Sequence, residues 1–114
     1  MTEPLARRAC KPCEGGTEPL PASAAQALLR DVMGWELVEG TMIRKRVRCK
    51  DFLQAVHLID RIAPVAEAED HHPDLHLTGY RTLTVELSTH AIGGLSENDF
   101  ILAAKIDVLL ASSV

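Results

Sequence analysis

Hydrophobic and polar residues follow two periods along the chain, one typical of helices and one typical of strands. Apolar residues recur at three- and four-residue steps in three segments that predict helices, 22–33, 51–68 and 97–111. Shorter apolar or alternating runs predict strands over 35–38, 41–49, 75–80 and 82–88. The last of these strands is the clearest, because Leu83, Val85 and Leu87 alternate with polar residues.

The order of these segments predicts the fold class. Each pair of neighbouring strands is expected to form an antiparallel hairpin, and the helices stand between and around the two pairs. We expect an α+β fold of order α-β-β-α-β-β-α, with a four-stranded antiparallel sheet that carries its helices on one face. Residues 1–20 contain several Pro and Gly and no apolar period, so they predict an extended N-terminal arm, partly ordered against the body, before a single domain over 21–114.

Two of the predicted helices have irregular features. Pro64 lies inside the segment 51–68, where a proline costs about 3 kcal/mol, so we expect a kink or a helix that ends and restarts. Asp51 suits the N-cap of that helix. The last helix is apolar on more than one face, and in so small a domain its second face predicts contact with another subunit.

Composition and charge exclude several classes of protein. The chain has 114 residues, 46% hydrophobic and 25% charged, which is ordinary for one globular domain. Its formal net charge of −4 argues against general binding to nucleic acid or anionic membrane. The sequence shows no membrane span and no signal segment, and its 3 cysteines do not suit a disulfide framework. We therefore expect a cytoplasmic protein with no nucleic acid and no membrane partner.

Histidines and carboxylates gather in one part of the chain. The members of this cluster are His71, His72, His76 and His90 with Glu67, Glu69, Asp70 and Asp74. Pro73 pushes His72 out of helical conformation, so the pair His71-His72 is expected in a turn between a helix and a strand. His90 follows the strand 82–88, and Asp99 lies in the first turn of the last helix. Because imidazoles exchange protons near neutral pH, the cluster predicts acid–base chemistry.

The complete motif resembles that of the pterin-4α-carbinolamine dehydratases. That family's pattern is an acidic residue, His-His-Pro, an aromatic residue, Thr-His and a downstream Asp. Here the pattern is filled at the expected spacing by Glu67, His71-His72-Pro73, Tyr80, Thr89-His90 and Asp99. The similarity extends to Cys13–Gly16, to Gly34-Trp35 and to the run Ala103–Asp107. A composite motif spread over nearly the whole chain is far more specific than a lone His-His-Pro.

The resemblance implies a hydro-lyase that removes water from a 4a-hydroxytetrahydropterin and gives the quinonoid dihydropterin. The family's usual task is to recycle the pterin cofactor of aromatic amino acid hydroxylases. The reaction needs a general acid and a general base, but no redox cofactor and no metal. Members of the family form dimers and tetramers, which together with the apolar last helix predicts a homodimer or a tetramer.

The resemblance also implies which residues act. The catalytic set is His71, His72 and His90, with proton transfers assigned to His71 and His90 and substrate binding to His72. The substrate-binding set is Glu67, Asp70, Pro73, Thr89 and Asp99. Glu67 is expected to orient His71 or to hydrogen-bond the pterin, and Asp99 to orient a histidine or to cap the last helix.

Two other interpretations remain open at this level. A zinc site from Glu67 and His71, with His72 or His76 and His90, is the enzymatic alternative, although adjacent histidines rarely converge on one ion. The pair Cys10 and Cys13 has no second pair to complete a metal site and is expected to stay unpaired. The other alternative is a non-catalytic binding or assembly partner, as in relatives that assist a homeodomain transcription factor or enzyme assembly. Such relatives lose the catalytic histidines, and all three stand in this chain.

Overall fold

The computed structural model, which describes residues 4–10 and 18–111, has the predicted order of helices and strands with two short 3₁₀ turns added. The helices are α1 (Ala22–Leu29), α2 (Phe52–Glu69) and α3 (Glu97–Ala111). The strands are β1 (Glu36–Val38), β2 (Met42–Arg48), β3 (Asp74–Thr78) and β4 (Thr82–Leu87). The 3₁₀ turns are η1 (Leu5–Arg7) and η2 (His90–Ile92). Within the described residues, no helix has the length and apolar character needed to cross a membrane.

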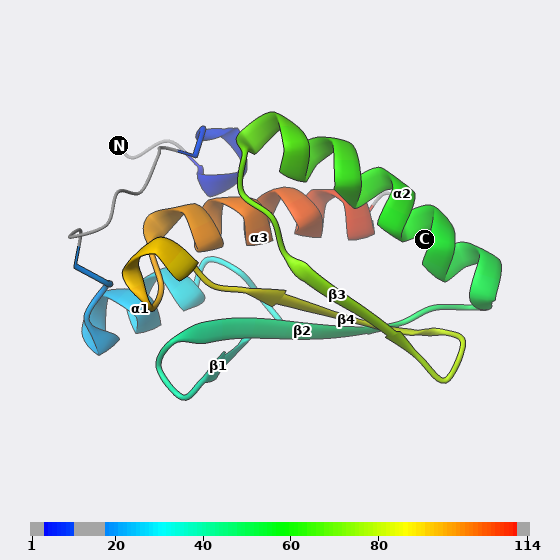
Figure 1. Cartoon of the computed structure of the whole chain (residues 1–114), viewed down its shortest axis with the longest axis horizontal. Coiled ribbons are helices and arrows are strands. Elements are labelled where there is room, and N and C mark those ends of the chain that lie inside the picture. Colours follow the sequence, from blue (N-terminus) through cyan, green and yellow to red (C-terminus); the bar gives the residue numbers. More distant parts are fainter. Residues whose placement is uncertain (1–3, 11–17, 112–114) are drawn as a thin grey trace.

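The four strands form one antiparallel sheet in the order β1-β2-β4-β3, with α2 and α3 stacked on one of its faces (Figure 1). The predicted α+β fold is therefore confirmed. Leu83, Val85 and Leu87 of β4 are fully buried beneath the helices, as their alternation predicts. The intervening positions face away from the helices, where Arg44 of β2 pairs with Glu36 and lies opposite Glu86 in the register.

Helix α2 runs without a break through Pro64, so the expected end and restart at this residue does not occur. Pro64 and Asp60 are both exposed, and water can therefore bind the Asp60 carbonyl that loses its helical partner. Asp51 caps the start of the helix by accepting a hydrogen bond from the Gln54 N–H at 2.8 Å.

The other end of α2 turns sharply at Asp70. Its φ of 50° is left-handed, and the following His71 N–H bonds the Ala66 carbonyl at 3.2 Å, as in a Schellman motif. The helix therefore stops directly before the histidine pair. The chain then enters β3 with both histidines at the turn.

Helix α3 is buried on several sides by its own chain. Its buried residues, Asn98 to Ala103 and Ile106, lie among the sheet, α1, α2 and the turn η1. Leu5 of η1 belongs to the same core at 7% exposure, although no apolar period marks the segment. Helix α2 and the N-terminal segment thus cover part of the apolar surface of α3, whereas Val108 near the end of the helix is exposed, so contact of this helix with another subunit stays a prediction.

Candidate active site

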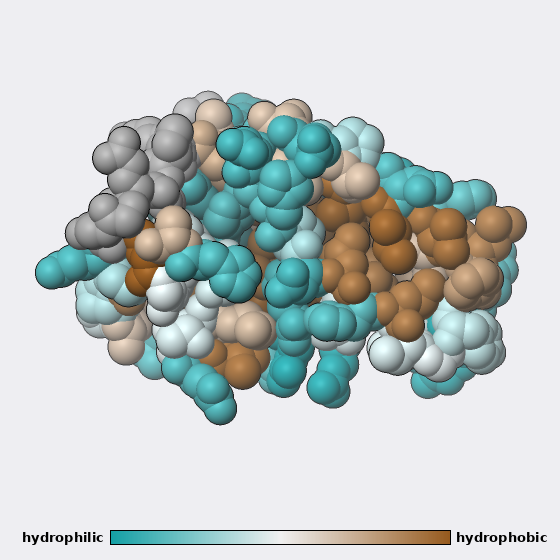
Figure 2. Space-filling model, viewed as in Figure 1, coloured by the Kyte–Doolittle hydropathy of each residue, from teal (hydrophilic) through white to brown (hydrophobic). Residues whose placement is uncertain are grey.

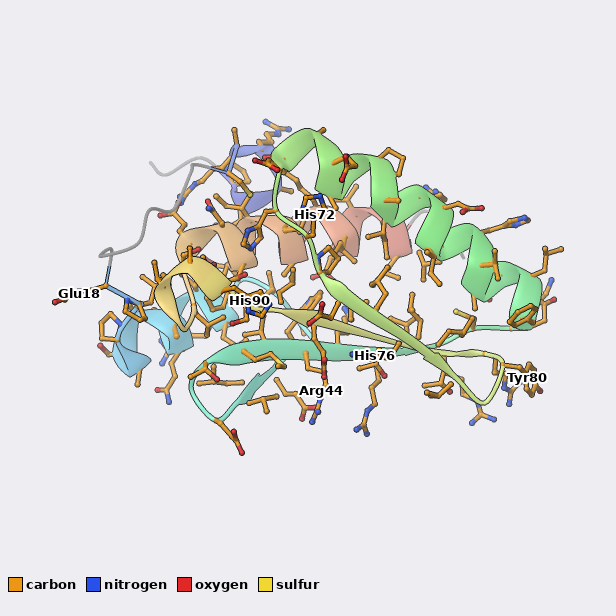
Figure 3. All side chains as sticks on the ribbon, viewed as in Figure 1. Glu18, Arg44, His72, His76, Tyr80 and His90 are labelled. Carbon is orange, nitrogen blue, oxygen red and sulfur yellow. The ribbon has the colours of Figure 1, made fainter. Side chains whose placement is uncertain are left out.

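A cavity of about 560 Å³ lies where the end of α2, the exit of β4, the start of α3 and the N-terminal segment meet (Figure 3). Its volume falls in the range of about 300–1,000 Å³ that is usual for small-molecule sites. The cavity is lined by Cys10, Ala68, Glu69, Asp70, His71, His72, Ser88, Thr89, His90, Ala91 and Asn98. The structure thus brings the three motif histidines together, with Asp70 and Thr89 beside them. Glu67, Pro73 and Asp99 are not among the lining residues.

His71 is held by a buried carboxylate behind the cavity wall. Its Nε2 lies 2.6 Å from Oδ1 of Asp99, with the two side chains 11% and 0% exposed. The other oxygen, Oδ2, accepts from the Thr89 hydroxyl at 2.9 Å and from the Ser96 backbone N–H at 3.0 Å. Asp99 therefore both orients a histidine and caps α3. Hydrogen bonds to both oxygens offset the cost of burying the carboxylate.

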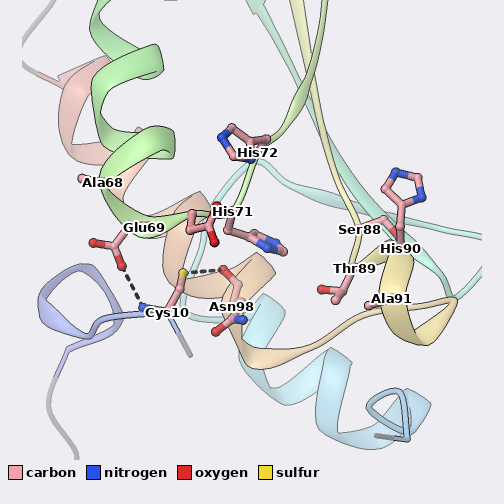
Figure 4. Close-up of a pocket in the computed structure, with 11 residues that line it drawn as sticks. Cys10, Ala68, Glu69, His71, His72, Ser88, Thr89, His90, Ala91 and Asn98 are labelled. Atoms are coloured by element: carbon pink, nitrogen blue, oxygen red, sulfur yellow. Dashed lines mark hydrogen bonds between the residues drawn. The ribbon is translucent and has the colours of Figure 1, made fainter. Parts of the chain in front are cut away.

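The loop after β4 carries His90 to the rim of the cavity. Thr89 and Gly94 form an antiparallel bridge, in which the Thr89 N–H donates to the Gly94 carbonyl at 2.8 Å, and η2 stands between them. Gly94 allows this closure because a Cβ at its position would lie 2.9 Å from Cβ of Pro19. The His90 side chain is exposed and, within the described part of the chain, forms no hydrogen bond or ion pair. In the close-up it stands on the other side of the cavity from His71 and His72 (Figure 4).

Each remaining histidine of the cluster has its own carboxylate partner. His72 Nε2 lies 2.6 Å from Oε1 of Glu67, and both side chains are largely exposed. Glu67 therefore orients His72, and the expectation that it might orient His71 is wrong because Asp99 occupies that position. His76 pairs with Glu86 at 2.8 Å on the sheet face away from the helices. The ligands that a zinc site would require are thus separated, and among the described residues no group of three or more His, Cys, Asp or Glu side chains is placed to hold a metal ion.

Six of the cavity residues were not predicted as site residues, and Cys10 and Glu69 are the two titratable ones among them. The Cys10 N–H donates to Oε1 of Glu69 at 2.7 Å, and its Sγ lies 3.7 Å from the Asn98 carbonyl oxygen (Figure 4). Burial, aided by the negative charge of Glu69, raises the pKa of the Cys10 thiol to about 12. Glu69 stands beside the motif in the sequence, whereas nothing local to Cys10 indicates its position. Cys13, the other member of the pair, lies outside the described residues.

Comparison with known sequences finds relatives over most of the chain. The model of a family described as pterin 4 alpha carbinolamine dehydratase matches residues 18–109. A Nitrosomonas eutropha protein, provisionally named a pterin-4-alpha-carbinolamine dehydratase, is 49% identical over 109 residues, which cover 95% of each chain. The mitochondrial pterin-4-alpha-carbinolamine dehydratase 2 of Arabidopsis thaliana is 43% identical over 92% of this chain and 58% of its own.

Solved structures show the same architecture. A Brucella melitensis protein described as a transcriptional coactivator/pterin dehydratase superposes with a TM-score of 0.75 at 32% identity, covering 81% of this chain and 98% of its own. A pterin dehydratase-like protein described as a RuBisCO assembly factor in the alpha-carboxysome superposes with a TM-score of 0.56 at 22% identity, covering 67% and 88%. The second likeness establishes the fold alone.

Proposed function

This chain belongs to the pterin 4 alpha carbinolamine dehydratase family, whose activity is that of a lyase, and we propose that it dehydrates a 4a-hydroxytetrahydropterin through its three cavity histidines. The observation that carries the proposal is the pair formed by His71 and the buried Asp99, which faces the exposed His90 across one cavity. One histidine is fixed in orientation and the other is free to turn. This asymmetry suits a base and an acid that act on opposite parts of one substrate.

The reaction divides into two proton transfers. The bond between C4a and the hydroxyl oxygen breaks as a general acid protonates the leaving oxygen, and water departs. A ring nitrogen gives its proton to a general base, and the electrons of that N–H bond complete the quinonoid system. No electrons leave the substrate overall, so the step needs no redox partner.

His71 is assigned as the base. Asp99 accepts the proton on Nε2, so Nδ1 is the ring atom left to take a proton from the substrate. His90 is assigned as the acid, since its exposed ring can approach a hydroxyl at the mouth of the cavity and recover a proton from solvent. His72, steadied by Glu67, is assigned to substrate binding together with Asp70 and Thr89. Pro73 contributes through the backbone, by keeping His72 extended.

The test is turnover of a 4a-hydroxytetrahydropterin by the purified chain. Replacing His71 or His90 by Ala is expected to lower kcat by about 10²–10⁴, the usual contribution of a positioned acid or base. His72→Ala is expected to raise KM more than it lowers kcat. His76→Ala is the matched control, because His76 also pairs with a carboxylate but lies outside the cavity. Wild-type turnover in both His71→Ala and His90→Ala would contradict the proposal.

The physiological role proposed for this activity is recycling of the pterin cofactor of aromatic amino acid hydroxylases, in the cytoplasm. Among the described residues Cys10 and Cys49 are free thiols, which suits a reducing compartment. The alternative, a non-catalytic binding or assembly partner, has behind it the shared fold of the RuBisCO assembly factor and the description of the Brucella melitensis protein as a transcriptional coactivator/pterin dehydratase, but the assembled histidine cavity favours the enzyme.

A further inference from the structure

We propose that residues 4–10 form a latched wall of the pterin site, in which Cys10 contacts the substrate and Glu69 is the positioning residue that holds the wall in place. This inference rests on the proposed function, because it assigns a role in substrate affinity to a segment outside the family motif. The segment lies beside α3 and the end of α2, and in the close-up Cys10 faces the side of the cavity that carries Thr89 and His90 (Figure 4).

Several contacts outside the cavity fasten the segment to α3. Leu5 is buried in the hydrophobic core at 7% exposure. The Lys105 ammonium donates to the Ala6 carbonyl at 2.8 Å, and Arg8 pairs with Glu97 at 2.6 Å. These contacts fix the position of residues 4–10 beside the cavity. The backbone of residues 4–10 is therefore a fixed part of the wall.

Glu69 makes the contact nearest to the catalytic histidines. One carboxylate oxygen accepts the Cys10 N–H at 2.7 Å, and the other lies 4.0 Å from the Lys105 ammonium. A hydrogen bond to a carboxylate is stronger than one between neutral groups. Glu69 also lies in the last turn of α2, just before Asp70 and His71. Its hydrogen bond with Cys10 therefore joins the N-terminal segment to the histidine-bearing end of the helix.

The Cys10 side chain presents a neutral surface to the cavity. Its thiol is directed to the Asn98 carbonyl at 3.7 Å, and its raised pKa keeps it protonated at neutral pH. A protonated thiol is a poor nucleophile, so Cys10 is not assigned to the chemistry. Sulfur makes favourable contacts with flat aromatic rings, and a pterin is such a ring. Loss of the thiol should therefore weaken binding and leave the chemical step intact.

Steady-state kinetics test the two residues separately. We expect Cys10→Ala to raise KM about two- to tenfold with kcat unchanged, which is the signature of lost uniform binding. Glu69→Ala should raise KM at least as much, and Glu69→Gln should restore most of the affinity because its amide oxygen still accepts the Cys10 N–H. Glu97→Ala is the matched control, since it removes another contact of the same segment at a side chain that does not line the cavity, and it should raise KM less than Glu69→Ala. An unchanged KM in both Cys10→Ala and Glu69→Ala would overturn the inference.

Alkylation of Cys10 gives a readout that does not depend on turnover. In a Cys13→Ser background, iodoacetamide should modify Cys10 slowly, faster in Glu69→Ala, and more slowly when a stable dihydropterin saturates the wild-type site. If the wild-type chain turns over pterin but dihydropterin gives no protection, Cys10 does not contact the substrate, and the proposed function stands. If the wild-type chain neither turns over pterin nor is protected, the proposed function fails. Equal alkylation rates in the wild type and Glu69→Ala would show that Glu69 does not hold this segment in place.

Discussion

Asp99 reaches His71 with one carboxylate oxygen and the start of its own helix with the other. Oδ1 lies 2.6 Å from the imidazole, while Oδ2 accepts from the Ser96 N–H and the Thr89 hydroxyl. The orientation of the proposed base therefore depends on the same side chain that caps α3. The same carboxylate thus couples the structure of this helix end to the geometry of the site.

Asp99→Asn should separate the two roles of this side chain. The amide oxygen can still accept from Ser96, but an amide NH₂ facing His71 no longer favours a proton on Nε2. We expect kcat to fall by about 10²–10⁴ while the melting temperature changes little. Glu67→Gln serves as the control, because Glu67 holds the exposed His72 and its loss should act mainly on KM. A variant Asp99→Asn with wild-type kcat would remove His71 from the role of base.

Activity should not depend on a metal ion. The carboxylates that pair with His71 and His72 leave the two histidines with separate partners, and neither pair has a third ligand nearby in the described chain. We therefore expect full turnover after exhaustive treatment with a chelator, measured beside the untreated protein. Loss of activity on chelation, with recovery on adding zinc, would show that the metal-free mechanism is wrong.

Self-association should use α2 and β3. Figure 2 shows a hydrophobic surface over these elements, Phe52 and Leu53 of α2 are exposed, and β3 is an edge strand that can pair with another chain. We expect a homodimer or tetramer at micromolar concentration, which Leu53→Glu should dissociate. Met33→Glu is the matched control, since Met33 is also exposed but belongs to neither α2 nor β3. Light scattering measures the mass, and a wild-type mass of 12.4 kDa would reject the prediction.

The stability of the fold should fall at alkaline pH in part through Cys10. Its thiol pKa is raised from 9.0 to about 12 in the folded chain, so the unfolded chain loses this proton first. The contribution is complete below about pH 9 and is lost as pH rises toward 12. Cys10→Ala should therefore reduce the loss of unfolding free energy between pH 8 and pH 10 in urea titrations. Cys49, whose thiol pKa is also raised by burial, acts in the same direction and is present in both chains.

Local patterns predicted the sheet and the bounds of α2 and α3 well, whereas α1 ends at Leu29 and not at the predicted residue 33. The alternation of Leu83, Val85 and Leu87 identifies a strand with one buried face, and Asp51 identifies a helix start, because each signal is completed by near neighbours. The effect of Pro64 on the helix could not be predicted from near neighbours. A proline disfavours a helix by its own chemistry, but whether the helix continues depends on whether the Asp60 carbonyl meets water, and burial decides that.

Features set by distant contacts were predicted poorly. Nothing in the sequence near Leu5 or Cys10 indicates that they cover α3 and the cavity, because their positions depend on Lys105, Glu97 and Glu69. For the same reason the sequence did not indicate that η1 covers part of the apolar surface of α3. The motif identified the three histidines, but their carboxylate partners follow from how the helix ends meet in space. Spacing alone did not separate Glu67 from Asp99 as the partner of His71.

The left-handed backbone conformation of Asp70, which ends α2, restricts the positions at which this chain can gain or lose residues. Helix α2 spans 18 residues, a length of about 27 Å, and its capped start and Schellman end fix both limits. One residue inserted into α2 before Asp70 would rotate the His71-His72 pair by about 100° about the helix axis and move it by about 1.5 Å along that axis. Insertions there should separate His71 from Asp99 altogether. The hairpin at Gly79-Tyr80 faces no such restriction, so length variation among natural and engineered versions should fall at that tip and spare α2.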